Sequence, residues 1–88
     1  AFYLNSNIVF PCSYPIKVIG VSDKVSRDSV YRISRLHFKG IRLDDIQPQY
    51  SKKGNYVSFR LNVIAEGEEQ LKAFHRTLME LDGIKMVL

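Results

Sequence analysis

The stretch NYVSFRLNVIA, residues 55–65, alternates polar and apolar side chains along most of its length. This alternation predicts a β-strand with one buried face, because successive side chains of a strand point to opposite sides of the sheet. The apolar face consists of Val57, Phe59, Leu61 and Val63, and the other of Tyr56, Ser58, Arg60 and Asn62. A sheet with one apolar face needs a second layer to cover it, so this stretch predicts a layered domain.

Two other parts of the chain have the period of a helix, and these are expected to form the covering layer. The first runs from Lys24 to about Lys39, with Gly40 expected as a left-handed C-terminal cap. The second runs from about Glu68 to Leu81 and starts after Gly67. The expected apolar stripes are Val25, Val30, Ile33 and Leu36 in the first helix, and Leu71, Phe74, Leu78 and Leu81 in the second.

Three further segments are predicted as extended, which completes the element order β-α-β-β-α-β. Residues 10–15 contain two prolines and are interpreted as an extended arm, followed by a strand at 16–22. Residues 42–51 form an edge strand, because Pro48 cannot donate to a ladder, and residues 84–88 form the last strand. The prediction is an α+β, ferredoxin-like βαββαβ two-layer sandwich, with an antiparallel sheet in the order 4-1-3-2 and two helices on one face. Residues 1–9 are expected to form an N-terminal tail, and residues 10–88 a single domain.

Composition excludes several classes of protein. Cys12 is the only cysteine, so no internal disulfide forms, and no Cys/His spacing fits a metal site. We therefore expect no metal, no cofactor and a cytoplasmic, reducing setting. No apolar run approaches the roughly 18 residues that span a membrane, and the first ten residues lack the features of a signal peptide. The formal charge of +4 favours anionic partners without indicating nucleic acid.

The stretch SKKGNYVSF, residues 51–59, has the composition of an RNA-binding strand but not its spacing. Base stacking on a sheet needs two aromatic side chains on one face, whereas Tyr56 and Phe59 are three residues apart and fall on opposite faces. Lys53, Gly54, Asn55 and Tyr56 are better interpreted as a hairpin motif in which Gly54 and Asn55 accept positive φ. Nucleic acid is thus not the expected partner, and single-stranded RNA binding on the open sheet face remains the alternative function.

Several stretches together resemble the YbeD-like family of small bacterial domains, and the resemblance extends from Phe10 to Leu88. The resemblance implies a fold similar to ACT-like regulatory domains, with no established activity and no catalytic residues to transfer. The chain differs from the family at His75, where Tyr is usual, at Tyr50, where Pro is frequent, and in the serines of its first helix. The matching stretches are FP at 10–11, KVIG at 17–20, His37, SKKGNY at 51–56, EQL at 69–71 and KMVL at 85–88.

An acylphosphatase-like phosphate loop is the main enzymatic alternative. Gly20, Val25 and Arg27 lie roughly where that loop would be, but Lys24 stands where a second glycine is needed. Successive backbone N–H groups converge on an anion only with such glycines, so phosphatase activity is not expected.

The remaining reactive side chains have structural interpretations. His37 and His75 are expected to pack at their helices, without a carboxylate at the spacing of a catalytic triad. Cys12 is expected to fill apolar space, since no basic cluster near it lowers its pKa. Asp44 and Asp45 are paired carboxylates, but no group of polar residues accompanies them, so we expect a solvated loop.

The candidate binding site is the face of the sheet that the helices leave uncovered. Lys17, Arg60 and Lys85 are expected there on neighbouring strands, interrupted by Ile19 and Val87. Amide side chains nearby are Gln47, Gln49 and Asn62. Such a face suits a small anionic metabolite, an acidic protein partner or the interface of a homodimer, or it is only a solvated surface. The sequence therefore favours a non-catalytic regulatory or binding module.

Overall fold

The fold was examined in a computed structural model, which describes residues 9–88. The expected tail, residues 1–9, lies outside the described residues except for Val9. The elements in chain order are β1 Cys12–Val21, α1 Arg27–His37, the 3₁₀ turn η1 Leu43–Asp45, β2 Gln47–Tyr50, β3 Tyr56–Ala65, α2 Glu68–Met79 and β4 Ile84–Val87. This order confirms the predicted βαββαβ sequence of elements.

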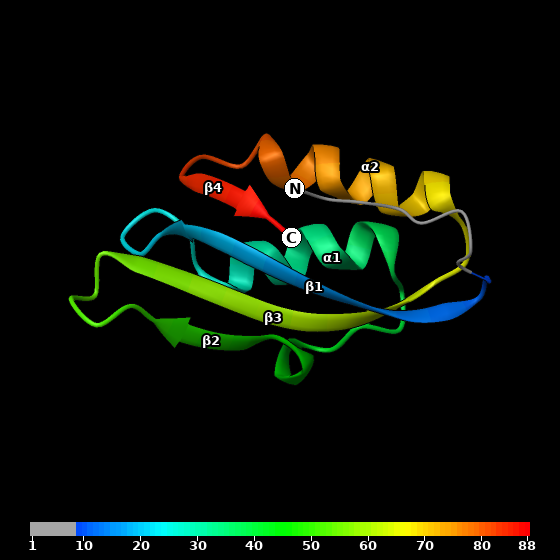
Figure 1. Cartoon of the computed structure of the whole chain (residues 1–88), viewed down its shortest axis with the longest axis horizontal. Coiled ribbons are helices and arrows are strands. Elements are labelled where there is room, and N and C mark those ends of the chain that lie inside the picture. Colours follow the sequence, from blue (N-terminus) through cyan, green and yellow to red (C-terminus); the bar gives the residue numbers. More distant parts are fainter. Residues whose placement is uncertain (1–8) are drawn as a thin grey trace.

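The four strands form one antiparallel sheet in the order β2-β3-β1-β4, which is the predicted order written from the other edge. Both helices lie behind the sheet in Figure 1, and the strands face the viewer. The chain therefore has the ferredoxin-like two-layer architecture, and one face of the sheet carries no helix.

The core lies between the sheet and the two helices. Val57, Phe59, Leu61 and Val63 are all buried, as the alternation in β3 predicts. Phe74 of α2 is fully buried and meets Phe38 edge to face, with 5.0 Å between the ring centroids. Such aromatic contacts add to the apolar burial that holds a two-layer domain together.

The first helix differs from its prediction at both ends and in its stripe. Ser26 caps the N-terminus, because its hydroxyl accepts a hydrogen bond from the Ser29 amide at 3.1 Å, so Val25 is buried just outside the helix. Leu36, expected in the stripe, is 76% exposed, while Ser34 is buried in its place. The Ser34 hydroxyl donates to the Val30 carbonyl at 2.7 Å, and this bond satisfies its polar atom inside the helix.

The C-terminal cap of α1 is also different from the prediction. The cap residue is Phe38, in an extended conformation, with its amide donating to the Ser34 carbonyl. Gly40 does not have the expected left-handed conformation, since the glycines with positive φ among residues 9–88 are Gly54 and Gly83. The second helix begins after Gly67 as predicted, but it ends at Met79, so half-buried Leu81 follows it.

The expected arm at residues 10–15 is mostly strand, because β1 already begins at Cys12. Pro15 lies inside this central strand and pairs with Asn62 of β3. The Lys17 amide points toward β4, where it donates to the Leu88 carbonyl at 3.0 Å. Pro15 is two residues earlier, so its backbone nitrogen points to the same edge of β1. β4 and Leu88 do not extend along β1 as far as Pro15, so its missing N–H removes no ladder bond.

The hairpin between β2 and β3 explains the SKKGNY stretch by local chemistry. Gly54 has φ of +78°, and its amide donates to the Ser51 carbonyl at 2.9 Å. Ser51 and Tyr56 bond through their backbones, and the Ser51 hydroxyl also accepts from the Tyr56 amide. Asn55 does not have the expected positive φ. The hydroxyl and amide of Ser22, which follows β1, donate to the carbonyls of Gly54 and Asn55 respectively, so the hairpin is tied to the end of the central strand.

Candidate functional site

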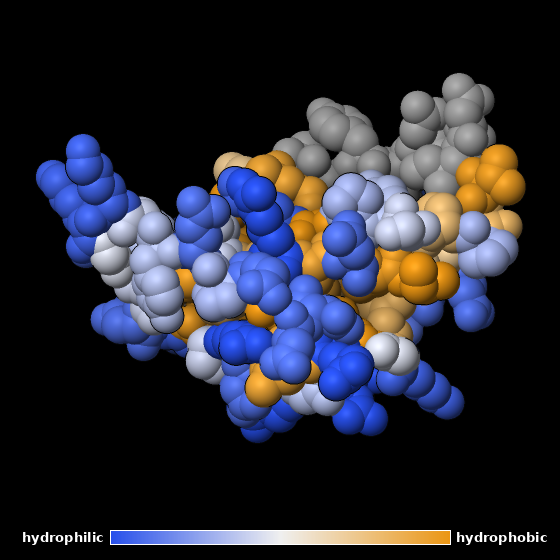
Figure 2. Space-filling model, turned by 90° about the horizontal axis from the view of Figure 1, so that it is seen from below, coloured by the Kyte–Doolittle hydropathy of each residue, from blue (hydrophilic) through white to orange (hydrophobic). Residues whose placement is uncertain are grey.

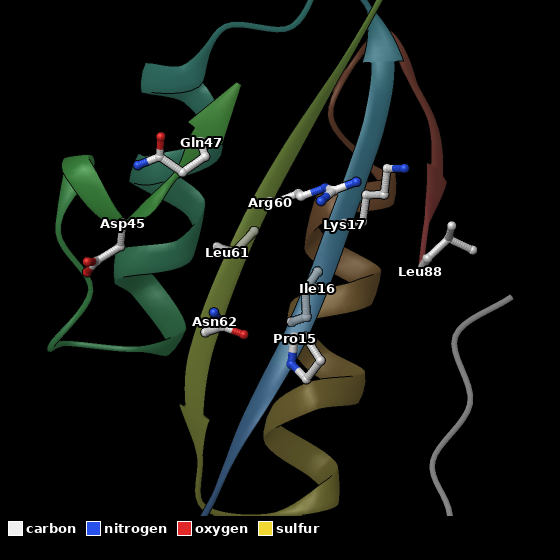
Figure 3. Close-up of a pocket in the computed structure, with 9 residues that line it drawn as sticks. All are labelled: Pro15, Ile16, Lys17, Asp45, Gln47, Arg60, Leu61, Asn62 and Leu88. Carbon is white, nitrogen blue, oxygen red and sulfur yellow. The ribbon is translucent and has the colours of Figure 1, made fainter. Parts of the chain in front are cut away.

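The open face of the sheet is centred on Lys17 and Arg60. These residues are direct partners in the antiparallel ladder between β1 and β3, so both side chains leave the same face. Figure 3 shows the Arg60 side chain extending across β1 toward Lys17. The ion pairs of residues 9–88 involve other side chains, so the two cations stand side by side without an ion pair to a carboxylate.

The backbone register places these cations in one row that crosses β2, β3 and β1 and ends at Leu88, just after β4. Gln47 of β2 is opposite Arg60, and Leu88 bonds through its backbone to Lys17. The Gln47 amide donates to the Asp44 carbonyl at 2.6 Å, which holds this end of the row against η1. The row therefore has a polar end at β2, two cations in its centre and an apolar end beside β4.

Two shallow grooves meet at the Lys17–Arg60 pair. The larger has a volume of about 500 Å³ and the smaller about 250 Å³. Lys17 and Arg60 line both, so a ligand in either groove contacts the paired charges. The larger groove is lined in addition by Pro15, Ile16, Asp45, Gln47, Leu61, Asn62 and Leu88, all labelled in Figure 3, and the smaller by Ile19, Gln49, Tyr50, Ser51, Tyr56, Val57 and Ser58.

The structure does not add Lys85 to this pair. A register shift between Ile19 and Gly20 places Met86 opposite Ile19 and Ile84 opposite Gly20, which leaves Lys85 as the extra residue on β4. Lys85 lines neither groove. Of the three expected cations, Lys17 and Arg60 therefore line the grooves and Lys85 does not.

The prediction that Val87 lies on the open face is wrong, because Val87 is opposite Val18 and is 2% exposed in the core. Met86 occupies the open face instead, beside Ile19. The bulge shifts the alternation of β4, and nothing in the four letters IKMV indicates it. Leu88, Pro15 and Ser58 also line the grooves and were missed, although the alternation of β3 places Ser58 on this face.

The other candidate residues have structural partners. Arg27 does not face an open phosphate loop, because its guanidinium donates to the Leu43 carbonyl at 2.9 Å and lies 3.4 Å from the Asp44 carboxylate. Asp45 accepts from the Arg42 amide at 2.8 Å and so caps η1. Half-buried Cys12 packs against the core at the start of β1. Burial, and then the nearby Cys12, raise the pKa of the Tyr14 hydroxyl.

His37 joins the two helices. Its Nε2 lies 3.1 Å from the Thr77 hydroxyl, and its ring packs against Phe74 with 5.6 Å between centroids. The Gln70 amide donates to the His37 carbonyl at 2.8 Å. Burial lowers the pKa of His37, because removing water penalises the charged imidazolium. Its neighbours are those of a packed histidine, as expected.

Neither a metal site nor a membrane-spanning helix is found in the described part of the chain. No three His, Cys, Asp or Glu side chains among residues 9–88 are grouped so that they could hold a metal ion. The helices found there are too short and too polar to cross a bilayer.

Comparison with known proteins identifies the family. Residues 5–88 match the family described as "Protein of unknown function (DUF493)". The chain belongs to this family. A UPF0250 protein from Pseudomonas entomophila is 40% identical over 82 residues, covering 92% of this chain and 89% of the relative. A second, from Neisseria gonorrhoeae, is 35% identical over 83 residues, covering 94% and 91%. These relatives confirm the resemblance to the YbeD-like family.

The fold of the DUF493 chain also has a counterpart among solved structures. The solution structure of protein HP0495 from H. pylori superposes with a TM-score of 0.70. The alignment covers 100% of this chain and 98% of that one, at 15% sequence identity. This likeness supports the two-layer fold and carries no information about activity.

Proposed function

We propose that this DUF493 protein is a non-catalytic, regulatory binding module that holds a small anionic metabolite on the open face of its sheet. The observation that carries the proposal is the Lys17–Arg60 pair. Like charges directly opposite on neighbouring strands repel each other, so the pair opposes folding. An anion placed between the two cations removes this repulsion and gains charge-assisted hydrogen bonds.

The shape of the face supports a small ligand. The larger groove, of about 500 Å³, falls within the range of about 300–1,000 Å³ that is typical of small-molecule sites. Its lining combines the two cations with the Asn62 amide and apolar groups from Pro15 and Leu88. The one carboxylate in this lining, Asp45, accepts a hydrogen bond from the Arg42 amide at 2.8 Å. This combination suits a carboxylate or phosphate attached to a short apolar body. The single, half-buried Cys12 is in accord with action in the cytoplasm.

Nuclear magnetic resonance titration tests the proposal. Inorganic phosphate, pyrophosphate and a panel of small mono- and dicarboxylates are added to the ¹⁵N-labelled protein. We expect one or more of these probes to shift the amide signals of Lys17, Ser58 and Arg60, and to do so less as salt is added. The double variant Lys17→Gln, Arg60→Gln should lose these shifts.

The matched control, Lys52→Gln with Lys53→Gln, removes two cations from the hairpin. It should retain the shifts of the three amide signals. If the control loses binding as strongly as the double variant, or if no probe shifts the three amides, the sheet face is only a solvated surface.

The same titration, followed by sedimentation, tests a homodimer on this face, since Ile19 and Met86 present apolar surface there. A dimer that excludes every probe replaces the metabolite as the occupant.

Single-stranded RNA binding is the second candidate for the same face. It is supported by Tyr56, which is half exposed and lines the smaller groove together with Lys17 and Arg60. Sheets that bind RNA stack bases on two or three aromatic side chains. Tyr50 also lines the smaller groove, but it is opposite Val57 and so leaves the other face of the sheet. Within residues 9–88 the register makes Tyr56 the only aromatic side chain on the open face, so the metabolite is the better-supported ligand.

A further inference from the structure

The loop after α1 forms a second basic groove, separate from the sheet face. It has a volume of about 530 Å³ and is lined by the end of α1, residues 39–42 and η1. Because α1 lies behind the sheet and Lys17 and Arg60 project from its uncovered face, the two sites do not overlap. The lining residues used below are Tyr31, Arg35, Lys39, Arg42, Leu43 and Asp44.

Three cations of this groove have no acidic partner among residues 9–88. The ion pairs on this side join Arg27 to Asp44 and Arg32 to Asp28, and they leave Arg35, Lys39 and Arg42 unpaired. Asp44 is the one carboxylate that lines the groove, and its charge is opposed by Arg27 at 3.4 Å. Three positive charges therefore remain concentrated around one depression, which attracts an anionic partner.

Arg35 is held in place before any partner arrives. Its guanidinium donates to the Tyr31 hydroxyl at 2.9 Å and lies 5.7 Å from the centre of the Tyr31 ring. Fixing a long side chain in advance reduces the entropy that binding would otherwise cost. Tyr31 and Arg35 are four residues apart on α1, which corresponds to a rise of about 6 Å along the helix.

The groove and its surroundings also present apolar surface. Leu43 lines the groove and is 38% exposed, and the Tyr31 ring lines it from α1. Figure 2 shows the side of the molecule on which η1 lies, and hydrophobic residues there are scattered among strongly hydrophilic ones. A nucleic-acid backbone offers nothing to cover the exposed Leu43 side chain, whereas a protein segment with acidic and apolar residues matches both features.

We propose that this groove, formed by Tyr31, Arg35, Lys39, Arg42 and Leu43, docks an acidic amphipathic helix of a partner protein. Carboxylates three or four residues apart lie on one face of such a helix, so several of them can meet the groove's three cations, of which Arg35 lies on α1 and Lys39 and Arg42 follow it. The apolar side chains of the partner helix cover Leu43 and pack against Tyr31. The charges set the orientation and the rate of association, and the apolar contacts add affinity.

A second copy of this chain is a weaker candidate for the occupant. Its own acidic helix end is the first turn of α2, where Glu68 and Glu69 are present. Both of these carboxylates are already near Lys72, at 3.1 Å and 3.9 Å. They are therefore less available to the groove than the carboxylates of a separate acidic helix.

The test measures binding of a fluorescent synthetic helix that carries Glu at i, i+4 and i+8 and Leu on one adjoining stripe. The full chain should bind it, and the triple variant Arg35→Gln, Lys39→Gln, Arg42→Gln should bind at least tenfold more weakly. The matched control Lys24→Gln, Lys52→Gln, Lys53→Gln removes three cations elsewhere and should change the affinity by less than twofold. A peptide with Ser in place of Leu should also bind several-fold more weakly.

Two results with the variants would overturn the proposal: no binding of the peptide by the unmodified chain, or an equal loss of affinity in the triple variant and its control. Two results with the ligands would also overturn it: equal affinity for the Ser and Leu peptides, or tighter binding of an oligouridylate through the same three cations. A dimer detected by sedimentation and abolished by the triple variant would instead identify a second copy as the occupant. The Lys17→Gln, Arg60→Gln variant should bind the peptide normally, so failure here is distinguishable from failure at the sheet face.

Discussion

Lys17 and Arg60 are direct cross-strand partners at the centre of the open sheet face, and no carboxylate among residues 9–88 forms an ion pair with either. Selection for stability alone favours an oppositely charged pair at such a position. The arrangement therefore links the fold to the proposed ligand, because an anion relieves a repulsion that the unliganded protein carries.

Neutralising one member of this pair should stabilise the unliganded protein. We expect Arg60→Gln to raise the free energy of unfolding by about 0.2–1 kcal/mol, the usual range for cross-strand pairs. Thermal unfolding at low salt measures the change, which at the upper end is an increase of about 4–8 °C for a domain of this size. In roughly 1 M salt, where charges are screened within about 3 Å, the gain should disappear.

The hairpin variant Lys53→Gln provides the comparison, because this residue is exposed and lies outside the paired strands. It should change the melting temperature little at either salt concentration. A loss of stability in Arg60→Gln at low salt would contradict the repulsion and weaken the proposed function with it.

Gly20 lies where β1 passes close to the turn before α1 and to the turn between α2 and β4. A Cβ atom there would lie 2.7 Å from Val25 Cγ2 and 2.9 Å from the Gly83 carbonyl oxygen. We expect Gly20→Ala to cost about 1–3 kcal/mol, as overpacked cores do, in a urea unfolding experiment. Gly40→Ala is the control, since a Cβ at Gly40 meets nothing within 4 Å and its φ is not positive. Equal stability of the two variants would show that the contact at Gly20 relaxes without cost.

The parts of the fold that the sequence predicts are those decided by local pattern. The alternation of β3 determines which of its residues face the helices, and the stripe Leu71, Phe74 and Leu78 determines the buried side of α2. Gly54 has the positive φ that its place in the hairpin requires. Each of these depends on neighbouring residues alone, so one sequence is sufficient.

The errors arise where a distant segment decides the outcome. Pro15 is tolerated in a central strand because β4, at the other end of the chain, does not extend beside it. Ser34 is buried and Leu36 is exposed because α1 packs against the rest of the domain through the side that carries Val30 and Ser34. The bond from the Ser34 hydroxyl to the Val30 carbonyl satisfies the polar group that this packing buries.

The candidate site was predicted in part for the same reason. Lys17 and Arg60 lie on strands of regular alternation, and the sequence places both on one face. Lys85 and Val87 lie beyond a bulge that shifts the alternation of β4 by one residue. The groove after α1 was not predicted, because its cations come from a helix and a loop whose approach depends on tertiary packing.

Binding of single-stranded RNA, if it occurs, should be weak and nonspecific. Tyr56 is the single aromatic side chain on the open face of residues 9–88, so few bases can stack. We expect affinity for oligouridylate and mixed-sequence oligomers to be similar and to fall steeply with salt, since it would depend on phosphate contacts.

Tyr56→Ala should accordingly change oligonucleotide affinity by less than about threefold in a fluorescence titration. Loss of a stacked base would cost about 1–3 kcal/mol, which is more than fivefold in affinity, so a smaller change means that no base stacks on Tyr56. Arg60→Gln should weaken the same binding and reduce its dependence on salt. A sequence-selective complex that Tyr56→Ala abolishes would make RNA, and not a metabolite, the ligand of this face.

His37 should make the stability of the domain depend on pH. Its ring lies between the helices, and burial lowers its pKa from the ordinary value of about 6.5. The Thr77 hydroxyl donates to the Ala73 carbonyl at 2.9 Å, so its oxygen is left to accept from Nε2–H of a neutral ring. The unfolded chain therefore binds a proton at His37 more readily than the folded chain does.

The sign of the effect follows from this difference in proton uptake. Above about pH 7, His37 is neutral in both the folded and the unfolded state, so its contribution to stability does not change with pH. As the pH falls through about 6.5 toward the lowered pKa of the folded state, the unfolded state gains protons first, and stability is lost. We expect His37→Gln, whose amide can still donate to Thr77, to remove this part of the pH dependence. Urea unfolding of both proteins between pH 5 and 8 measures it, because carboxylates elsewhere titrate alike in the two and cancel in the difference. The curves should diverge as pH rises above 5 and run parallel above 7; curves that stay parallel throughout would show that the buried ring does not resist protonation.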